Sequence, residues 1–434
     1  HLDVHAFQTA LLRLVYRMIF LFVAEDRGAL LAPEADELTR ERFTRYFSTA
    51  RLRRHALRRL GTAHDDQYRA LELLIEALGS EEGRPELGLK GLGGLFNDGP
   101  ADKPLRGTRL ANRHLFEAVK HLARMRDTGS ARWRPVDYLH MGAEELGSVY
   151  EALLEQVPKH SAADRTFELV DRIGNDRKKT GSYYTPSALT ETLLDSTLNP
   201  VIDDAVKRGE QRANAEGRPD PADTIVEELL SLTVCDPACG SGHFLVAAAR
   251  RIAKRVAAVR DRNPEPTAES VRHALHEVVA RCVYGVDLNP MAVELAKVSL
   301  WLEAMEPGRP LSFLDAHIKH GNGLIGATPR VLRDGIPDKA FKAIEGDDEK
   351  FAKHLTKENE MQRTGNVGLF NLDAVQTKVS NTAFAAGLER IVAAPAESLI
   401  DVRRKEKSYR AWENSTEYIR ALHIADAWCA AFTS

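Results

Sequence analysis

A short segment combines a carboxylate with two closely spaced glycines, Cys235-Asp236-Pro237-Ala238-Cys239-Gly240-Ser241-Gly242. A short apolar run precedes it and a helical pattern follows, so we expect a glycine turn between a strand and a helix. Glycines let the backbone approach a ligand closely, and ligands of open α/β folds bind at the carboxyl ends of strands. Asp236 could pair with a cationic amino-acid group. The segment therefore predicts a site for a small charged molecule.

A second carboxylate ends the next expected strand, in Gly285-Val286-Asp287-Leu288-Asn289-Pro290. Asp287 could bind the two hydroxyls of a ribose. A nicotinamide dinucleotide site would need a third glycine and an acid about 20 residues further on. Here Leu245 stands at the third glycine's position, and Asp287 lies about 45 residues after Gly242. The spacing therefore argues against a dinucleotide.

The elements around these motifs alternate, with an apolar run at 232–235, helical patterns after Gly242 and at 271–280, a strand at 283–287 and a helix at 290–305. This alternation predicts an α/β fold with a parallel, doubly wound sheet. Apolar residues at three- and four-residue spacing predict helices at 7–22, 68–78 and 115–125. A Gly-rich turn region at 88–99 lies between the last two.

The other segments are expected to be helical or exposed. The polar, Gly- and Pro-bearing stretch 206–223 is expected to be an exposed excursion, and the chain after 329 to be helical. We expect a helical N-terminal domain (1–165), the first half of a ligand-binding α/β core (166–329) and a helical insertion (330–434).

The composition limits where function can lie. The 434 residues have a formal net charge of -3, so any nucleic-acid surface must be local. Four cysteines favour a reduced, cytoplasmic protein, and their spacing implies no metal. The apolar run 11–23 contains Arg13 and Arg17, so we expect a buried helix and no membrane anchor. The basic cluster Arg51, Arg53, Arg54, Arg58 and Arg59 is interpreted as a solvated helix face in preference to a phosphate-binding patch.

The glycine segment, continued as His243-Phe244-Leu245, resembles the cofactor loop of adenine-N6 DNA methyltransferases. Segments 14–28, 146–155 and 314–319 resemble the large single-chain methyltransferases of type IIG and IIL restriction systems and of BREX and DISARM phage defence, the PglX-like group. The likeness covers most of residues 1–330. It implies a class I methyltransferase fold, Rossmann-like and incomplete in this chain. The implied activity is transfer of a methyl group from S-adenosyl-L-methionine to adenine N6 at a specific DNA sequence, which marks host DNA.

The resemblance also implies a set of cofactor-binding residues. In the family, the segment matching Tyr184, Thr185 and Pro186 covers the methionine part of the cofactor, although Thr185 could equally cap a helix that begins with Pro186. Asp236 and Asp287 would position the cofactor, and Asn322 would contact its adenine unless Gly-Asn-Gly is only a tight turn. The remaining expected contacts are Ala238, Gly240, Gly242, Phe244 and Leu288. Phe244 could instead be core, and His243 is not taken as a general base.

No catalytic residue is assigned. Family members hold the flipped adenine with an Asn/Asp-Pro-Pro-aromatic tetrapeptide, and the sequence contains no Pro-Pro pair. Both ends of the chain are expected to be cut, and the strands that carry the tetrapeptide are expected beyond Ser434. No nuclease signature is found in residues 1–160.

Double-stranded DNA is the expected partner, with other proteins of a defence system. Two alternatives stay open. One is a scaffold that binds cofactor and DNA without chemistry. The other is a methyltransferase acting on protein glutamine or ribosomal RNA.

Overall fold

A computed structural model describes residues 3–126, 132–142, 144–147, 156–164, 166–171, 185–343, 346–363, 381–394 and 396–430. The chain divides into two compact units. Unit 1 comprises His1–Gly321 with Pro395–Arg404, and unit 2 comprises Asn322–Ala394 with Lys405–Ser434. Each unit is described by itself.

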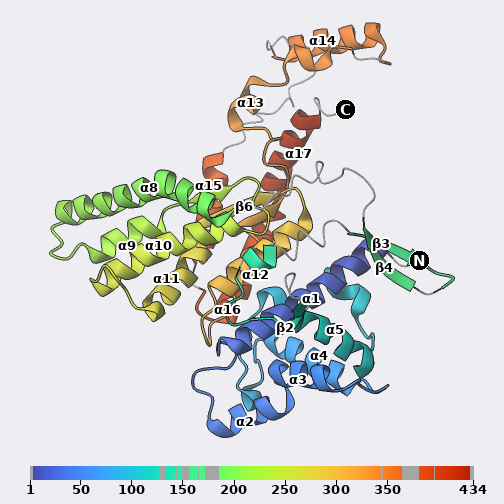
Figure 1. Ribbon diagram of the computed structural model, residues 1–434. Coiled ribbons are helices and arrows are strands. Elements are labelled where there is room, and N and C mark those ends of the chain that lie inside the picture. The colour runs from blue at the N-terminus through green and yellow to red at the C-terminus, as the bar shows by residue number, and fades with distance from the viewer. Residues whose placement is uncertain are drawn as a thin grey trace. The chain divides into compact units, whose positions relative to one another are not determined.

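The N-terminal part of unit 1 is mostly helical, and two short hairpins follow the helices (Figure 1). The helices predicted at 7–22 and 68–78 are confirmed, as is the turn region at 88–99. The helix predicted at 115–125 ends at Leu122, and the prediction was wrong for its last residues, because Arg124 and Met125 belong to a strand. The helices are α1 (Val4–Asp26), α2 (Glu37–Tyr46), α3 (Thr49–Arg58), α4 (Asp66–Gly79) and α5 (Asn112–Leu122), with 3-10 turns η1 (Pro85–Leu87), η2 (Gly94–Phe96) and η3 (Pro100–Leu105). Antiparallel hairpins are formed by β1 (Arg124–Arg126) with β2 (Trp133–Pro135), and by β3 (Gln156–Ser161) with β4 (Thr166–Asp171).

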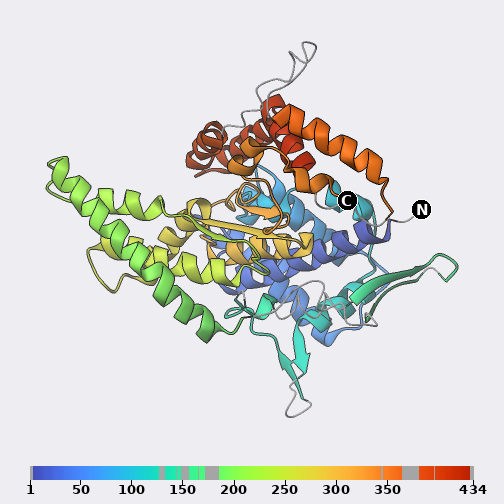
Figure 2. The same cartoon turned by 90° about the horizontal axis from the view of Figure 1, so that it is seen from above.

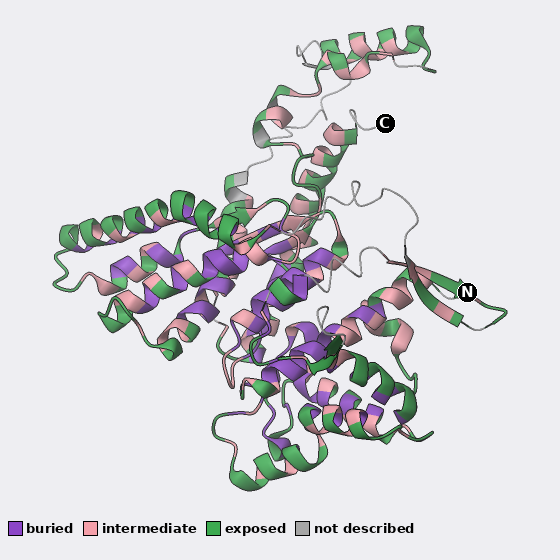
Figure 3. Cartoon of the chain, in the orientation of Figure 1, coloured by how far each residue is buried: buried purple, intermediate pink, exposed green. Residues whose placement is uncertain are grey.

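Helix α1 is a core helix. The Asp3 carboxylate caps its start by accepting a hydrogen bond from the Ala6 N–H, 3.0 Å away. Among the described residues, α1 is the one helix long and apolar enough to cross a membrane by length and composition. Its second half is instead buried against the protein (Figure 3), as expected from the sequence. The guanidinium of Arg17 is buried too, and it pairs with Asp102 at 2.8 Å.

A three-stranded parallel sheet forms the centre of the α/β part. Its strands lie in the order β5 (Val234–Asp236), β6 (Val283–Asp287) and β7 (Ile318–His320). The connections contain α10 (His243–Asp261), α11 (Ala268–Arg281) and α12 (Pro290–Glu303). The predicted alternation of strands and helices is therefore confirmed for this segment. Helices α8 (Ser187–Ala215) and α9 (Ala222–Leu230) precede it and pack against α10.

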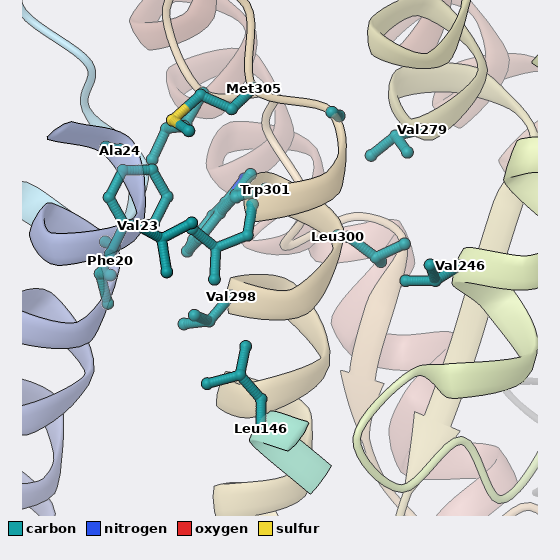
Figure 4. Packing of buried hydrophobic residues seen from close by; sticks show 14 of the residues in the cluster. Phe20, Val23, Ala24, Leu146, Val246, Val279, Val298, Leu300, Trp301 and Met305 are labelled. Carbon is teal, nitrogen blue, oxygen red and sulfur yellow. The ribbon is translucent and has the colours of Figure 1, made fainter. Parts of the chain in front are cut away.

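The helical part and the sheet share one apolar core. In Figure 4, Phe20, Val23 and Ala24 of α1 face Val298 and Trp301 of α12, and all five are buried. A polar contact supports the same packing, because Arg13 of α1 pairs with Glu294 of α12 at 3.2 Å. Arg27, just after α1, donates to the Leu302 carbonyl at 2.8 Å, near the end of α12. Helix α1 is thereby fixed along the length of α12.

The sequence interpretation of 206–223 was wrong in its first half. Helix α8 continues to Ala215, and only a short turn separates it from α9 (Figure 2). Arg212 of α8 pairs with Glu228 of α9 at 2.8 Å. Gly209 lies so close to α9 that an added Cβ would come within 2.5 Å of the Ile225 Cα. These contacts hold a polar sequence in a helix that its composition does not indicate.

The described part of unit 2 is helical, as expected for the chain after 329. Its helices are α13 (Pro329–Asp334), α14 (Glu349–Arg363), α15 (Asn381–Ala393) and α17 (Thr416–Ala430), with the 3-10 turn η4 (Asp338–Phe341); α16 (Leu399–Glu413) begins in unit 1 and continues into unit 2. Within this unit, the Trp428 ring N–H donates to the Gly335 carbonyl at 3.2 Å, which joins α17 to the end of α13.

Two buried tyrosines allow a matched test of how a hydrogen-bond partner changes the contribution of a buried hydroxyl to stability. The Tyr16 hydroxyl has no hydrogen-bond partner among the described residues, and burial raises the pKa of this phenol well above its usual value. The Tyr138 hydroxyl donates to the Leu122 carbonyl at 2.8 Å. An unpaired buried hydroxyl costs about 1–3 kcal/mol, and a made bond contributes about 0.5–1.5 kcal/mol. We expect Tyr16→Phe to raise the free energy of unfolding and Tyr138→Phe to lower it in urea titrations. Equal losses in both variants would contradict this expectation and would indicate a bound water at Tyr16.

Candidate functional site

The pairing of β5 with β6 brings the two predicted carboxylates to one edge of the sheet. Asp236 is the last residue of β5 and lies opposite Gly285, two residues before Asp287 at the end of β6. Since the strands are parallel, both carboxylates lie at their carboxyl ends, where open α/β sheets bind ligands. The sequence prediction that these residues share a site is consistent with this geometry.

The glycine turn connects β5 to α10 and crosses over β6. The Cys239 N–H donates to the Val286 carbonyl at 2.9 Å, and the Gly242 N–H donates to the Cys239 carbonyl at 2.8 Å. Gly240 and Gly242 have φ values of +53° and +83°, a region that side chains other than glycine's rarely adopt. A Cβ on Gly240 would meet no atom within 4 Å. The backbone of the turn therefore faces open space on one side.

Asp287 ties the turn to the second strand. One of its carboxylate oxygens accepts from the Gly240 N–H at 2.9 Å, and the other accepts from the Asn289 N–H at 2.8 Å. Asp236 is held similarly, because its carboxylate accepts from the Ala238 N–H at 3.0 Å. Each carboxylate oxygen can accept more than one hydrogen bond. Both carboxylates are thus fixed in position and retain acceptor capacity toward a ligand.

The site concentrates negative charge. Burial raises the pKa of the Asp236 carboxyl, and the nearby charge of Asp287 raises it further. Burial, with both of these charges, raises the pKa of the Cys239 thiol to about 12, so the thiol stays neutral. A cation bound between the two strands would relieve the repulsion of the carboxylates. The electrostatics of the edge therefore favour a ligand with a positive group.

Three other predicted residues surround the turn. Ala238 lies exposed within it, and Phe244, in the first turn of α10, is half-buried beside His243. Leu288 follows Asp287 directly and is 60% exposed. Its carbonyl oxygen lies 3.0 Å from Nε2 of His320, the last residue of β7. Burial lowers the pKa of His243, so this side chain is neutral at physiological pH.

The remaining predicted residues are not brought into this cluster by the described contacts. Tyr184 lies outside the described residues. Thr185 does not cap α8, which begins at Ser187 with Pro186 as its N-cap residue and no side-chain cap bond. Asn322 belongs to unit 2, where its side chain accepts from the N–H groups of Leu324 and Ile325. Asn322 is therefore a tight-turn residue in the structure.

Two residues next to the glycine turn, Gly285 and Asn289, were not predicted from the sequence to contribute to the site. Gly285 lies against the turn, because an added Cβ would come within 2.9 Å of Leu245 Cδ1 and 3.0 Å of Cys239 Sγ. Asn289 caps α12 by accepting from the Met291 N–H at 2.9 Å. The pair Asn289-Pro290 is a helix-start signature that could have identified this cap. Nothing in the sequence alone marks Gly285 as a contact of the loop.

A separate cavity of about 480 Å³ lies between α1, α12 and β7. Its lining includes Arg13, Glu294, Lys297 and Asp315, and these charges pair with one another. Neither Asp236 nor Asp287 lines it. We therefore place the candidate site at the glycine turn and not in this cavity.

Residues 212–309, which contain both carboxylates and the glycine turn, match the family model described as MmeI, DNA-methyltransferase domain. A putative type II restriction enzyme and methyltransferase of Methanocaldococcus jannaschii is 25% identical over 265 residues. The adenine-specific methyltransferase PglX of Streptomyces coelicolor is 29% identical over 164 residues. Over these segments the chain is similar to the MmeI and PglX methyltransferases. The matched parts cover 54% and 38% of this chain, but only 21% and 10% of the two relatives' lengths.

Among solved structures, the type IIL restriction-modification enzyme MmeI in complex with DNA gives a TM-score of 0.43 at 15% identity. The overlap covers 84% of this chain and 50% of the MmeI chain. The family model and the two sequence relatives confirm the resemblance to large restriction and defence methyltransferases that the sequence motifs indicated. Residues 212–309 are the segment that matches the DNA-methyltransferase domain of MmeI.

Removing the Asp236 charge should stabilise the ligand-free chain. We expect Asp236→Asn to raise the thermal unfolding midpoint at neutral pH by roughly 1–3 °C. The pKa of this carboxyl is raised in the folded state, so its ionised form costs stability there. The amide oxygen of asparagine keeps the bond from the Ala238 N–H. Differential scanning calorimetry across a pH series measures the effect.

The gain should be largest at neutral pH and should shrink on acidification. As the pH falls through the raised pKa, the wild-type carboxyl also becomes neutral and the two proteins converge. Asp204→Asn is the matched control, because Asp204 lies exposed on α8 and, among the described residues, pairs with the nearby Lys207. A midpoint of Asp236→Asn at or below that of the wild type would show that the Asp236 charge does not strain the site.

Proposed function

We propose that this chain supplies the cofactor-binding part of a DNA methyltransferase that uses S-adenosyl-L-methionine to modify adenine N6 at a specific sequence. The match of residues 212–309 to a DNA-methyltransferase domain supports the reaction class. The similarity to the adenine-specific methyltransferase of Streptomyces coelicolor supports adenine as the target. The similarity to the putative type II restriction enzyme and methyltransferase of Methanocaldococcus jannaschii supports a restriction setting. The modification would mark host DNA in the cytoplasm, within a restriction or phage-defence system.

The observation that carries this proposal is the pair of carboxylates around an open glycine turn. Asp236 and Asp287 end adjacent parallel strands, and each is held by a backbone N–H of the turn. S-adenosyl-L-methionine carries a cationic amino-acid end and a ribose with two hydroxyls. Asp236 suits the ammonium group and Asp287 suits the hydroxyl donors. The open space at Gly240 leaves room for the ligand against the backbone.

The other predicted residues would enclose the same ligand. The cofactor supplies the methyl group when it is bound. Tyr184, Thr185 and Pro186 would cover its methionine part, and Asn322 would contact its adenine. Ala238 and Gly242 belong to the turn itself, whereas Phe244 and Leu288 offer apolar surface beside it. The 60% exposure of Leu288 supports this role, because a bound ring would cover the side chain.

The same proposal includes the fold class and the domain boundaries. The parallel order β5-β6-β7, with helices between the strands, supports a class I, Rossmann-like sheet. The domains would be a helical region at 1–165, the methyltransferase core at 166–329 and a helical insertion at 330–434. No Asn/Asp-Pro-Pro-aromatic tetrapeptide occurs in the 434 residues. We therefore assign this chain cofactor binding and leave the catalytic residues unassigned.

Calorimetric titration of the chain with S-adenosyl-L-methionine tests this assignment. We expect the wild type to bind and both Asp236→Ala and Asp287→Ala to lose roughly tenfold or more in affinity. A hydrogen bond to a charged group contributes about 1.5–3 kcal/mol, and about 1.4 kcal/mol corresponds to tenfold. Asp204→Asn should bind as the wild type does, since Asp204 lies exposed on α8.

The ligand series separates the proposed cofactor from related molecules. S-adenosylhomocysteine should also bind, because it shares the ribose and the amino-acid end. NAD should not bind, because the third glycine and the spaced acid of a dinucleotide site are missing. A wild-type chain that is folded by circular dichroism but binds neither adenosyl compound would contradict the proposal. So would equal affinity of wild type and both alanine variants.

A further inference from the structure

The hairpin of β1 and β2 projects from the helical part of unit 1. It follows α5 directly, and its strands pair antiparallel, with Met125 opposite Arg134 and Arg126 opposite Trp133. In Figure 2 the two teal strands at the bottom of the view extend away from the helices. Nearly all of its described residues are exposed. A two-stranded ribbon of this kind contributes little to the core, so its sequence is free to serve another purpose.

The hairpin is strongly basic in a chain that is slightly acidic overall. Residues 124–135 contain four arginines and one acidic residue, Asp127, whereas the whole chain has a formal net charge of -3. Arg124, Arg126 and Arg132 form no ion pair with any residue that the structure describes. Exposed arginines elsewhere commonly pair, as Arg106 does with Asp98. The uncompensated charge of the hairpin therefore points toward an anionic partner.

Exposed apolar side chains lie among these arginines. Trp133 is 57% exposed and Met125 is 55% exposed. Residues directly opposite one another in an antiparallel pair lie on the same face, so Arg126 and Trp133 share one face of the ribbon. Arg124, two residues before Arg126, lies on that face too. One face thus combines a large exposed aromatic ring with two guanidinium groups that form no ion pair within the described part of the chain.

We propose that the β1–β2 hairpin contacts duplex DNA. This inference rests on the proposed function, because a DNA methyltransferase must hold a duplex. The major groove, about 12 Å wide, admits a two-stranded β-ribbon. Arginine binds phosphate oxygens bidentately, and Trp133 offers a flat surface for a sugar or base edge. The contact lies outside the methyltransferase segment at 212–309 and adds DNA affinity that the net charge of the chain does not provide.

Helix α3 offers a control with the same charge change. Arg54, Arg58 and Arg59 are exposed at this helix and its end, and they too form no ion pair with a described residue. Here, however, acidic side chains lie nearby, since Glu37 and Glu41 line the same shallow depression as Arg54. No exposed aromatic accompanies the three arginines on α3. This helix was interpreted from the sequence as a solvated face.

The experiment measures binding of the 434-residue chain to a fluorescently labelled duplex by anisotropy, over a series of salt concentrations. We expect the triple variant Arg124→Gln, Arg126→Gln, Arg132→Gln to bind roughly tenfold or more weakly than the wild type, with a salt dependence shallower by up to about 3 in log–log slope. The triple variant Arg54→Gln, Arg58→Gln, Arg59→Gln should match the wild type in both quantities. All variants should keep the wild-type unfolding midpoint, because the changed side chains are exposed, or half-buried in the case of Arg124, and form no ion pair with a described residue.

Variants of Trp133 distinguish a contact made by the aromatic ring from attraction between charges alone. Trp133→Ala should weaken binding severalfold without changing the salt slope, because it removes no charge, and Trp133→Phe should restore part of the loss. If wild-type chain fails to bind DNA, or if both triple variants lose affinity equally, the hairpin is not the DNA contact. Stronger hairpin-dependent binding to phosphatidylglycerol vesicles than to DNA would also overturn the proposal, in favour of a membrane surface.

The same protein preparations distinguish failure of the proposed function from failure of this inference. Asp236→Ala should retain hairpin-dependent DNA binding while it loses S-adenosyl-L-methionine. Normal cofactor binding with no effect of the hairpin variants overturns only the inference. Hairpin-dependent DNA binding without any cofactor binding overturns only the cofactor assignment.

Discussion

The parallel pairing of β5 with β6 is the constraint on which the candidate site depends. The register places Asp236 opposite Gly285. Asp287 therefore lies two residues further along β6, at the same edge of the sheet, and accepts from the Gly240 N–H. A shift by one residue would turn the side chains of one strand to the other face and would separate the two carboxylates. The glycine turn, its bond to Asp287 and the approach of Cys239 to Gly285 all follow from this single alignment.

Much of this arrangement could be predicted from the sequence, because local signals and spacing agreed. Glycines next to a strand end, an acid at the end of the next strand and apolar periodicity in the helices each reflect short-range rules, and the β5–α10–α11–β6–α12 order followed from them. The ends of the strands fixed which residues share an edge. This is why Asp236, Gly240 and Asp287 could be grouped without any structure.

Long-range packing explains what the sequence could not indicate. Residues 206–215 are polar, yet they are helical because Arg212 pairs with Glu228 and Gly209 lies against Ile225. Both contacts depend on a helix that comes later in the chain. Gly285 is constrained by Leu245, 40 positions earlier in the numbering, and no local pattern records that approach.

The close packing of α1 on α12 has a consequence for how such proteins can diversify. Phe20, Val23 and Ala24 of α1 pack against Val298 and Trp301 of α12, which comes much later in the sequence of unit 1. Interiors tolerate changes in volume poorly, so a substitution on one helix calls for a matching one on the other. Recombination that joined the opening helices of one relative to the sheet of another would bring together two packing surfaces that had not evolved to fit each other. The two segments are therefore expected to be inherited as a pair.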